Sequence, residues 1–225
     1  MPGHLFGQLV VVDDLPGEFA ERVIECFHTR PDDTFSMALS GGETARRCYE
    51  RLAVDGAEQI DWWAVDVFWG DERCVPPDDP DANERLARDA LLERVGAANS
   101  VHPMRCDEGA DPYQLKLGEQ GRLDVVHLGL GADGHTASLF PESPALDADP
   151  GRLVVETEDP NGRNPHRRLT LTLGGIARGR HVIFTVAGED KRGALQAIVD
   201  GADLPAARVR ADRVIWLVDQ AAAPR

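Results

Sequence analysis

Short apolar runs alternate with helical patterns along the chain, and this alternation constrains the fold more than any other feature. The runs are rich in β-branched residues and are bounded by Gly, Pro or Asp, which is typical of strands. Helical periodicity lies between several of them, at residues 19–27, 44–53 and 191–199. This order predicts an α/β fold with a largely parallel sheet flanked by helices. The predicted strands are residues 9–12, 35–39, 64–69, 123–128, 153–155, 169–173, 182–186 and 214–218.

A further helix is predicted to begin near Asp81 and to run to about Val95. Asp81 precedes an apolar pattern and Glu84 follows three residues later, which is a capping-box signature. The segments 76–80 and 159–165 have loop composition, but neither is long or Ser/Gly-rich enough for a flexible linker. Because 225 residues can form one core, we expect residues 1–225 to be a single domain.

The formal net charge of −15 excludes several kinds of partner. Nucleic acid and anionic membranes are polyanions, so the summed field of the protein would repel both. An anionic substrate would therefore need a local basic pocket. Residues 1–14 lack the basic region of a secretory signal, and no segment reaches the length of an apolar membrane span. We expect a cytoplasmic protein with no membrane or nucleic-acid partner.

Cysteine and histidine spacing predicts neither a disulfide framework nor a metal site. Cys26, Cys48, Cys74 and Cys106 form no C-x-x-C pair, so we expect free thiols in a reducing compartment. The seven histidines include no H-x-x-x-H pair, and we expect no required metal. No G-x-S-x-G nucleophile elbow is present, so direct attack by water is the expectation for a hydrolase.

Ser40, Gly41 and Gly42 join the strand at 35–39 to the following helix, and Thr44 lies at its start. Glycine lets the backbone approach a ligand closely, and the free N–H groups of a helix N-terminus favour a phosphate. The alternative is a tight strand-to-helix turn in which Thr44 is only a cap.

Asp71 and Arg73 follow the strand at 64–69, and functional sites in open α/β sheets lie at the carboxyl ends of strands. Arg73 can hold a phosphate or sugar oxygen through two hydrogen bonds, and Asp71 is placed for a hydroxyl or a proton. An exposed cluster of ion pairs remains the alternative.

The glycine-rich turn at 129–134, after the strand at 123–128, is the most specific signal. His135 stands beside Asp133 and can serve as a general base whose tautomer an acidic partner fixes. His127, inside the apolar strand, is more simply a core residue. The turn also matches a G-x-G-x-x-G dinucleotide fingerprint. We discount that function because Asp133 would face the pyrophosphate and prolines would soon end the helix.

Two cations lie at element boundaries: Arg168 precedes the strand at 169–173, and Lys191 opens the helix at 191–199. Both positions allow a phosphate to be neutralised. Solvated surface cations are the alternative for Arg168 and its neighbour Arg167.

The segments 40–44, 70–73, 129–141, 168–172 and 188–191 together resemble, in the same order, the motifs of the 6-phosphogluconolactonases. Glucosamine-6-phosphate deaminases of the same superfamily continue the Asp-Gly-His turn into Phe-Asn-Glu-Pro. Here residues 137–141 read Ala-Ser-Leu-Phe-Pro, which is the lactonase form. The chain departs from the pattern at supporting positions: Ala-Asn-Glu at 82–84 replaces Ser-Asn-Tyr, and Ala45 replaces a proline.

The resemblance implies a modified Rossmann-like sheet, no cofactor, and a small phosphosugar lactone as the substrate. It implies hydrolysis of 6-phospho-D-glucono-1,5-lactone to 6-phosphogluconate in the oxidative pentose phosphate pathway, without a covalent intermediate. His135 would then deprotonate water, Asp133 would orient His135 or a sugar hydroxyl, and Asp71 would contact the sugar. Arg73 would also lie at the substrate. The 6-phosphate would be held by Ser40, Gly41, Gly42, Thr44, Arg168 and Lys191.

Two other functions stay open from the sequence. An amino-sugar phosphate deaminase or isomerase would use the same phosphate site but would open the ring and release ammonia. A non-catalytic sugar-phosphate-binding protein would keep the fold without turnover, although Asp133 and His135 are both retained. A monomer is compatible with these features.

Overall fold

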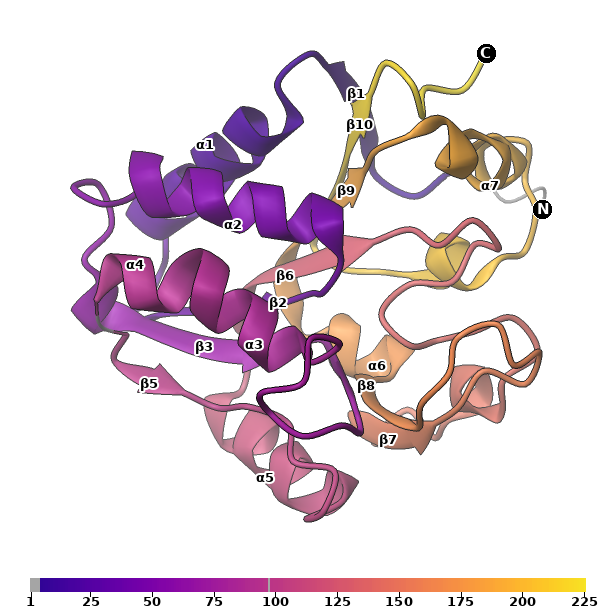
Figure 1. Ribbon diagram of the computed structural model, residues 1–225. Helices are drawn as coiled ribbons and strands as arrows, with labels where there is room; N and C mark the ends of the chain where they lie inside the picture. Colours follow the sequence, from indigo (N-terminus) through magenta and orange to yellow (C-terminus); the bar gives the residue numbers. More distant parts are fainter. Residues whose placement is uncertain (1–4, 97) are drawn as a thin grey trace.

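The computed structural model, which describes residues 5–96 and 98–225, contains one seven-stranded parallel sheet and one three-stranded antiparallel sheet. The large sheet has the order β1-β10-β9-β6-β2-β3-β5 (Figure 1). The fold class predicted from the sequence is confirmed. Its strands are β1 (Gln8–Val12), β2 (Phe35–Leu39), β3 (Val65–Trp69), β5 (Ser100–Val101), β6 (Leu123–Gly129), β9 (Gly179–Val186) and β10 (Arg213–Asp219).

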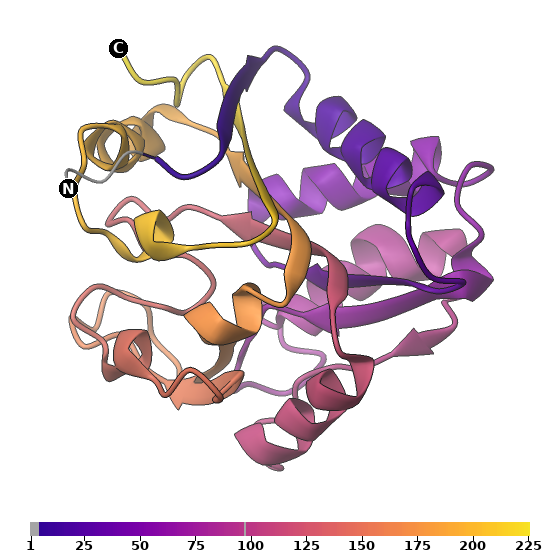
Figure 2. The same cartoon turned by 180° about the vertical axis from the view of Figure 1, so that it is seen from behind.

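Helices lie on both sides of the large sheet. Figure 1 shows α1, α2, α3 and α4 over one face, and Figure 2 shows α5 and α6 on the opposite side. A π-helical stretch, Arg88–Leu92, joins α3 to α4, so this helix reaches Val95 as predicted. The helices are α1 (Leu15–His28), α2 (Glu43–Asp55), α3 (Asn83–Ala87), α4 (Glu93–Val95), α5 (Ala110–Gln120), α6 (Leu173–Ile176) and α7 (Glu189–Val199). Short 3₁₀ turns occupy Trp62–Ala64, Pro144–Asp147 and Pro205–Arg208.

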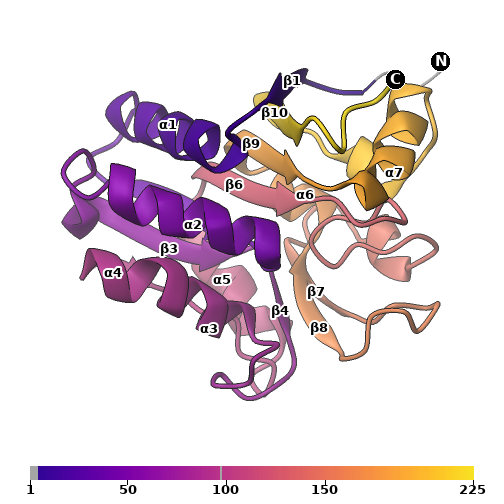
Figure 3. The same cartoon turned by 45° about the horizontal axis from the view of Figure 1, so that its top comes forward.

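The small sheet consists of β4 (Asp71–Arg73), β8 (Arg168–Leu171) and β7 (Val154–Thr157), in the order β4-β8-β7. Gly70 joins it to the large sheet, because its N–H donates to the Leu39 carbonyl at the end of β2. Figure 3 shows β4, β7 and β8 grouped beside the ends of the central strands. The sequence predicted β7 and β8 but neither β4 nor β5, both of which are very short.

The strand order creates a switch point between β2 and β6. From β2 the chain proceeds through β3 to the β5 edge, whereas from β6 it proceeds through β9 to β10. The connections at β2 and β6 therefore lead away in opposite directions and leave a crevice outside their carboxyl ends, the usual place for a ligand in such sheets. β2 and β3 are buried along their whole length, which fixes the crevice on a rigid base.

Two local predictions are wrong. The capping box at Asp81 does not form: the N-cap of α3 is Ala82, without a side-chain cap. The carboxylate of Glu72 instead accepts the N–H groups of Asn83 and Glu84, at 2.7 and 2.6 Å. A tertiary contact is the cause, because β4 brings this buried carboxylate to the N-terminus of α3. Residue 173 begins α6 rather than ending a strand, with Thr172 as its N-cap.

The expectation of free thiols holds for two cysteines and is wrong for the other two. Cys26 and Cys48 are free, whereas Cys74 and Cys106 form a disulfide with a Cα–Cα distance of 5.4 Å. It joins the loop after β4 to the loop before α5. Folding brings these loops together, and the spacing of the cysteines in the sequence does not indicate it. Within the part of the chain that the structure describes, no helix is long and apolar enough to span a bilayer.

Candidate active site

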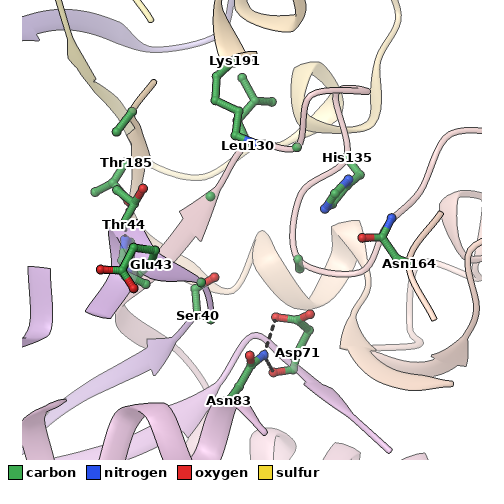
Figure 4. A pocket seen from close by; sticks show the side chains of 18 of the residues that line it. Ser40, Glu43, Thr44, Asp71, Asn83, Leu130, His135, Asn164, Thr185 and Lys191 are labelled. Atoms are coloured by element: carbon green, nitrogen blue, oxygen red, sulfur yellow. Dashed lines mark hydrogen bonds between the residues drawn. The ribbon is translucent and has the colours of Figure 1, made fainter. Parts of the chain in front are cut away.

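A cavity of about 330 Å³ lies at the carboxyl ends of β2, β6 and β9, with the small sheet beside it (Figure 4). Nine of the ten site residues proposed from the sequence line it, and the tenth, Asp133, contacts one of them. The fold therefore brings together five segments that are far apart in the chain. The nine lining residues are Ser40, Gly41, Gly42, Thr44, Asp71, Arg73, His135, Arg168 and Lys191.

The turn between β2 and α2, from Ser40 to Gly42, lines the cavity. Its last residue, Gly42, is the N-cap of α2, with φ of 95° and no side-chain cap. Only glycine adopts this conformation without strain. Thr44 is therefore not the cap that the alternative interpretation required. The turn is held from behind, because the N–H of Ser40 donates to the Tyr49 hydroxyl at 2.6 Å.

A second uncapped helix meets the same cavity. The N-cap of α7 is Gly188, with φ of 97° and no side-chain cap, and Lys191 projects from the first turn of the helix. Lys191 is partly exposed and lies 2.9 Å from the Asp190 carboxylate. Helix N-termini carry free donors and a positive dipole end, so α2, α7 and Lys191 together favour an anion.

His135 and Asp133 form a close pair in the turn after β6. Asp133 Oδ1 lies 2.6 Å from His135 Nδ1 and also accepts the His135 backbone N–H at 3.1 Å. Because the carboxylate can only accept, we assign the ring proton to Nδ1, which leaves Nε2 as a base. The hydrogen bond from His135 lowers the pKa of Asp133 to about 2, so this residue is an anion at neutral pH.

Glycine is required beside this pair. A Cβ at Gly131 would lie 2.1 Å from His135 Nδ1, so a side chain there would displace the ring. No α-helix follows the turn; the next element is a 3₁₀ turn at Pro144–Asp147. This agrees with our rejection of a dinucleotide-binding turn.

The small sheet places two guanidinium groups next to each other. The β4–β8 register sets Arg73 opposite Arg168, on the same face of the pair. Arg168 is only 7% exposed and lies 3.7 Å from Asp71, and burial lowers its pKa against the opposing effect of that carboxylate. The Nε atoms of both arginines are buried without a hydrogen-bond partner. Such a pair favours an additional anion, and the surface-cation interpretation is wrong for Arg168.

Asp71 is buried as well, so it does not belong to an exposed ion-pair cluster. Ser138 Oγ donates to its Oδ2 at 2.5 Å, and Asn83 Nδ2 donates to its backbone carbonyl at 2.8 Å. Figure 4 shows Asp71 and Lys191 on opposite sides of the cavity. A ligand that reaches both would span the whole space.

Several lining residues were missed by sequence reasoning, among them Asn83, Asn164 and Thr185. Thr185 had a usable signal, since it lies near the carboxyl end of β9 beside β6. His127 also reaches the wall but is a core residue as expected. Its ring nitrogens lie 2.8 Å from the Tyr49 hydroxyl and 2.8 Å from Thr185 Oγ1, and burial lowers its pKa to about 3.

The cavity thus combines an oriented histidine base, two uncapped helix N-termini and three cations. Such a set suits a small phosphorylated substrate that reacts with water activated by His135. Within residues 5–96 and 98–225, no group of three or more His, Cys, Asp or Glu side chains is arranged to hold a metal ion.

Comparisons with known proteins show the family of this chain. The chain is 38% identical to a 6-phosphogluconolactonase from Synechocystis over 90% of this chain and 91% of that protein. A 6-phosphogluconolactonase from Nostoc is 40% identical over 84% of this chain and 83% of the relative.

A solved structure, the 6-phosphogluconolactonase from Trypanosoma cruzi, superposes with a TM-score of 0.83 at 28% identity, covering 98% of this chain and 97% of the other. The family model described as glucosamine-6-phosphate isomerases/6-phosphogluconolactonase matches residues 10–216. The resemblance inferred from the motifs is therefore confirmed, and the chain belongs to the glucosamine-6-phosphate isomerase/6-phosphogluconolactonase family.

Proposed function

We propose that this chain hydrolyses 6-phospho-D-glucono-1,5-lactone to 6-phosphogluconate, the reaction of the oxidative pentose phosphate pathway. The observation that carries the proposal is the Asp133–His135 pair, 2.6 Å apart, in a cavity that also receives Arg73, Arg168 and Lys191. The names of the curated relatives support the same activity.

The phosphate group lies, in this proposal, against the N–H groups of Gly41 and Gly42, the Thr44 hydroxyl, Arg168 and Lys191. These groups act as a local basic pocket within a chain whose net charge is −15. The phosphate is remote from the reacting carbonyl, so its binding energy serves to place the lactone for attack. The hydroxyl of Ser40 completes this part of the site.

His135 Nε2 takes a proton from water as the water oxygen bonds to the lactone carbonyl carbon. The bond between that carbon and the ring oxygen then breaks, and His135 returns the proton to the ring oxygen. Asp133 remains an anion throughout and stabilises the imidazolium that forms transiently. Arg73 or the turn N–H groups would face the developing oxyanion, while Asp71 would hold a sugar hydroxyl.

The deciding experiment measures acid release from freshly made 6-phosphogluconolactone, corrected for spontaneous hydrolysis, beside ammonia release from glucosamine 6-phosphate. Acid release alone supports the lactonase. Ammonia release would favour the deaminase, and phosphosugar binding without either product would favour a non-catalytic binding protein.

We further propose that residues 1–225 act as one domain, because the cavity takes residues from both sheets. Cytoplasmic location and a monomeric state stay predictions, which cell fractionation and sedimentation can test. The state of the Cys74–Cys106 disulfide in cells bears on the location directly, since disulfides persist mainly in oxidising compartments.

A further inference from the structure

Asn83 connects two parts of the cavity wall that the proposed mechanism treats separately. It begins α3, is 1% exposed and lines the cavity between the turn after β2 and the strand β4. Its Nδ2 donates to the Asp71 carbonyl at 2.8 Å and lies 3.3 Å from Asp71 Oδ1. Figure 4 shows both interactions, with Asn83 below Asp71 and Ser40 in this view.

The backbone of Asn83 is fixed by Glu72, which lies between the two cavity residues Asp71 and Arg73 on β4. Because side chains alternate along a strand, Glu72 points away from the cavity and toward α3. Its carboxylate accepts the N–H groups of Arg73 at 2.7 Å, Asn83 at 2.7 Å and Glu84 at 2.6 Å. Asn83 therefore has little freedom to move relative to β4.

The other end of the carboxamide faces the turn after β2. Asn83 Oδ1 is buried and has no hydrogen-bond partner. It lies directly against Gly41: a Cβ built there would be 1.8 Å from Oδ1, and the three nearest atoms all belong to Asn83. A buried acceptor without a partner is destabilising. The contacts of Nδ2 with Asp71 account for the donor of this amide, but no hydrogen bond accounts for its oxygen.

We propose that Asn83 is a positioning residue that sets the distance between Asp71 and the Ser40–Gly42 turn, and so aligns the lactone with its phosphate. The proposal rests on the lactonase function. The amide group suits this position because its donor faces Asp71 while its oxygen packs against Gly41. Aspartate has the same shape but would place an oxygen against Asp71, and alanine would leave Gly41 without its neighbour.

The first test concerns the Asn83–Gly41 contact and needs no activity. Gly41 does not have a positive φ, so alanine is compatible with its backbone and only the steric contact opposes it. Gly41→Ala should lower Tm by roughly 3–10 °C in wild type, and this loss should largely disappear in an Asn83→Ala background. Gly118→Ala, where a Cβ meets nothing within 4 Å, is the matched control. Equal losses of Tm in both backgrounds would show that Asn83 is not what opposes a side chain at Gly41.

The second test concerns Asp71. Asn83→Asp should lower kcat roughly 10- to 100-fold, with a smaller change in KM, because a displaced Asp71 would misplace the sugar it holds and so misalign the lactone carbonyl for attack. Asn99→Asp is the matched control, since Asn99 Nδ2 donates to Asp66 at 2.8 Å outside the cavity; it should leave kcat unchanged.

Two results would overturn the proposal: a folded Asn83→Asp enzyme with wild-type kcat, or a loss confined to KM. If wild type releases no acid from the lactone, the proposed function fails. The Tm coupling between Gly41 and Asn83 would still show, without any activity, whether the two residues are in contact.

Discussion

The carboxyl edge of the large sheet and the small β4-β8-β7 sheet meet at one cavity, but they contribute different chemistry. The large-sheet edge presents local turns: Gly42 and Gly188 expose helix N-termini, and Asp133 pairs with His135 two residues away. The small sheet contributes charges that are distant in sequence, with Arg73 of β4 opposite Arg168 of β8.

This difference teaches where each kind of functional group is encoded. Groups within one turn depend on nearby glycines, so the sequence alone identifies them. A guanidinium pair depends on strand register across nearly a hundred positions, and neither strand is long enough to show its pairing in advance. We therefore expect the large-sheet edge to supply the base and most of the phosphate site. The small sheet should supply the charges that hold the rest of the substrate, and its own stability should depend on contacts between distant segments.

The largest effect should come from the large-sheet edge. His135→Ala should lower kcat roughly 10²- to 10⁴-fold, because the base that deprotonates water is removed while Asp133 and the cations remain. Steady-state rates on freshly made lactone, corrected for spontaneous hydrolysis, measure the loss. His28→Ala, at an exposed position near the end of α1, is the control. Near-normal turnover by folded His135→Ala would remove the histidine from the mechanism.

The small sheet should be sensitive to its covalent connection. Cys74 directly follows Arg73, and its disulfide to Cys106 closes a loop with a sequence separation of 32. Loop-closure entropy of that size predicts that the Cys74→Ser/Cys106→Ser double variant loses about 3–4 kcal/mol of unfolding free energy. Urea unfolding without reductant measures it, with Cys26→Ser as the free-thiol control. Equal stability of variant and wild type would show that the connection contributes nothing.

One cation from each region tests how the phosphate is shared. Arg168→Ala and Lys191→Ala should each reduce the preference for phosphorylated over unphosphorylated gluconolactone by about 1.5–3 kcal/mol, the rough contribution of a charge-assisted contact. The ratio of kcat/KM for the two lactones measures this preference.

Three patterns of loss distinguish the cases. A loss of preference in both variants means that the two regions share the phosphate. If Arg168→Ala instead weakens both substrates equally, the small sheet serves the sugar or the fold, and only Lys191 belongs to the phosphate site. Equal losses on both substrates in both variants would contradict the phosphate-site assignment altogether.

Sequence reasoning identified the fold class, all the longer strands and nine of the cavity residues because the signals were local. It missed Asn83 and the capping of α3 by Glu72, since β4 forms only when Asp71–Arg73 meets β8. It also missed the Cys74–Cys106 bridge for the same reason. Each omission depends on a contact between segments that are distant in the chain, and no periodic sequence pattern indicates such a contact.

The smallest effect concerns stability at acid pH and tests the Asp133–His135 pair of the large-sheet edge. In the folded protein, the hydrogen bond from His135 lowers the pKa of Asp133 from its ordinary 3.8 to about 2. A depressed carboxyl pKa adds stability above the unfolded value and loses it as pH falls. The contribution of Asp133 should therefore be present above pH 4 and fade between about pH 4 and pH 2.

Asp133→Asn removes this titration, so the variant should be less stable than wild type at pH 5 by at most about 2 kcal/mol, and less where solvent screens the carboxylate. The difference should shrink as pH falls toward 3. Urea unfolding at pH 5, 4 and 3 measures it, and Asp33→Asn, at an exposed position before β2, is the control. A gap that stays constant from pH 5 to 3 would mean that Asp133 supports the turn by shape alone. In that case the charge of Asp133 would contribute nothing to stability, and the backbone hydrogen bonds of the turn would account for the orientation of His135.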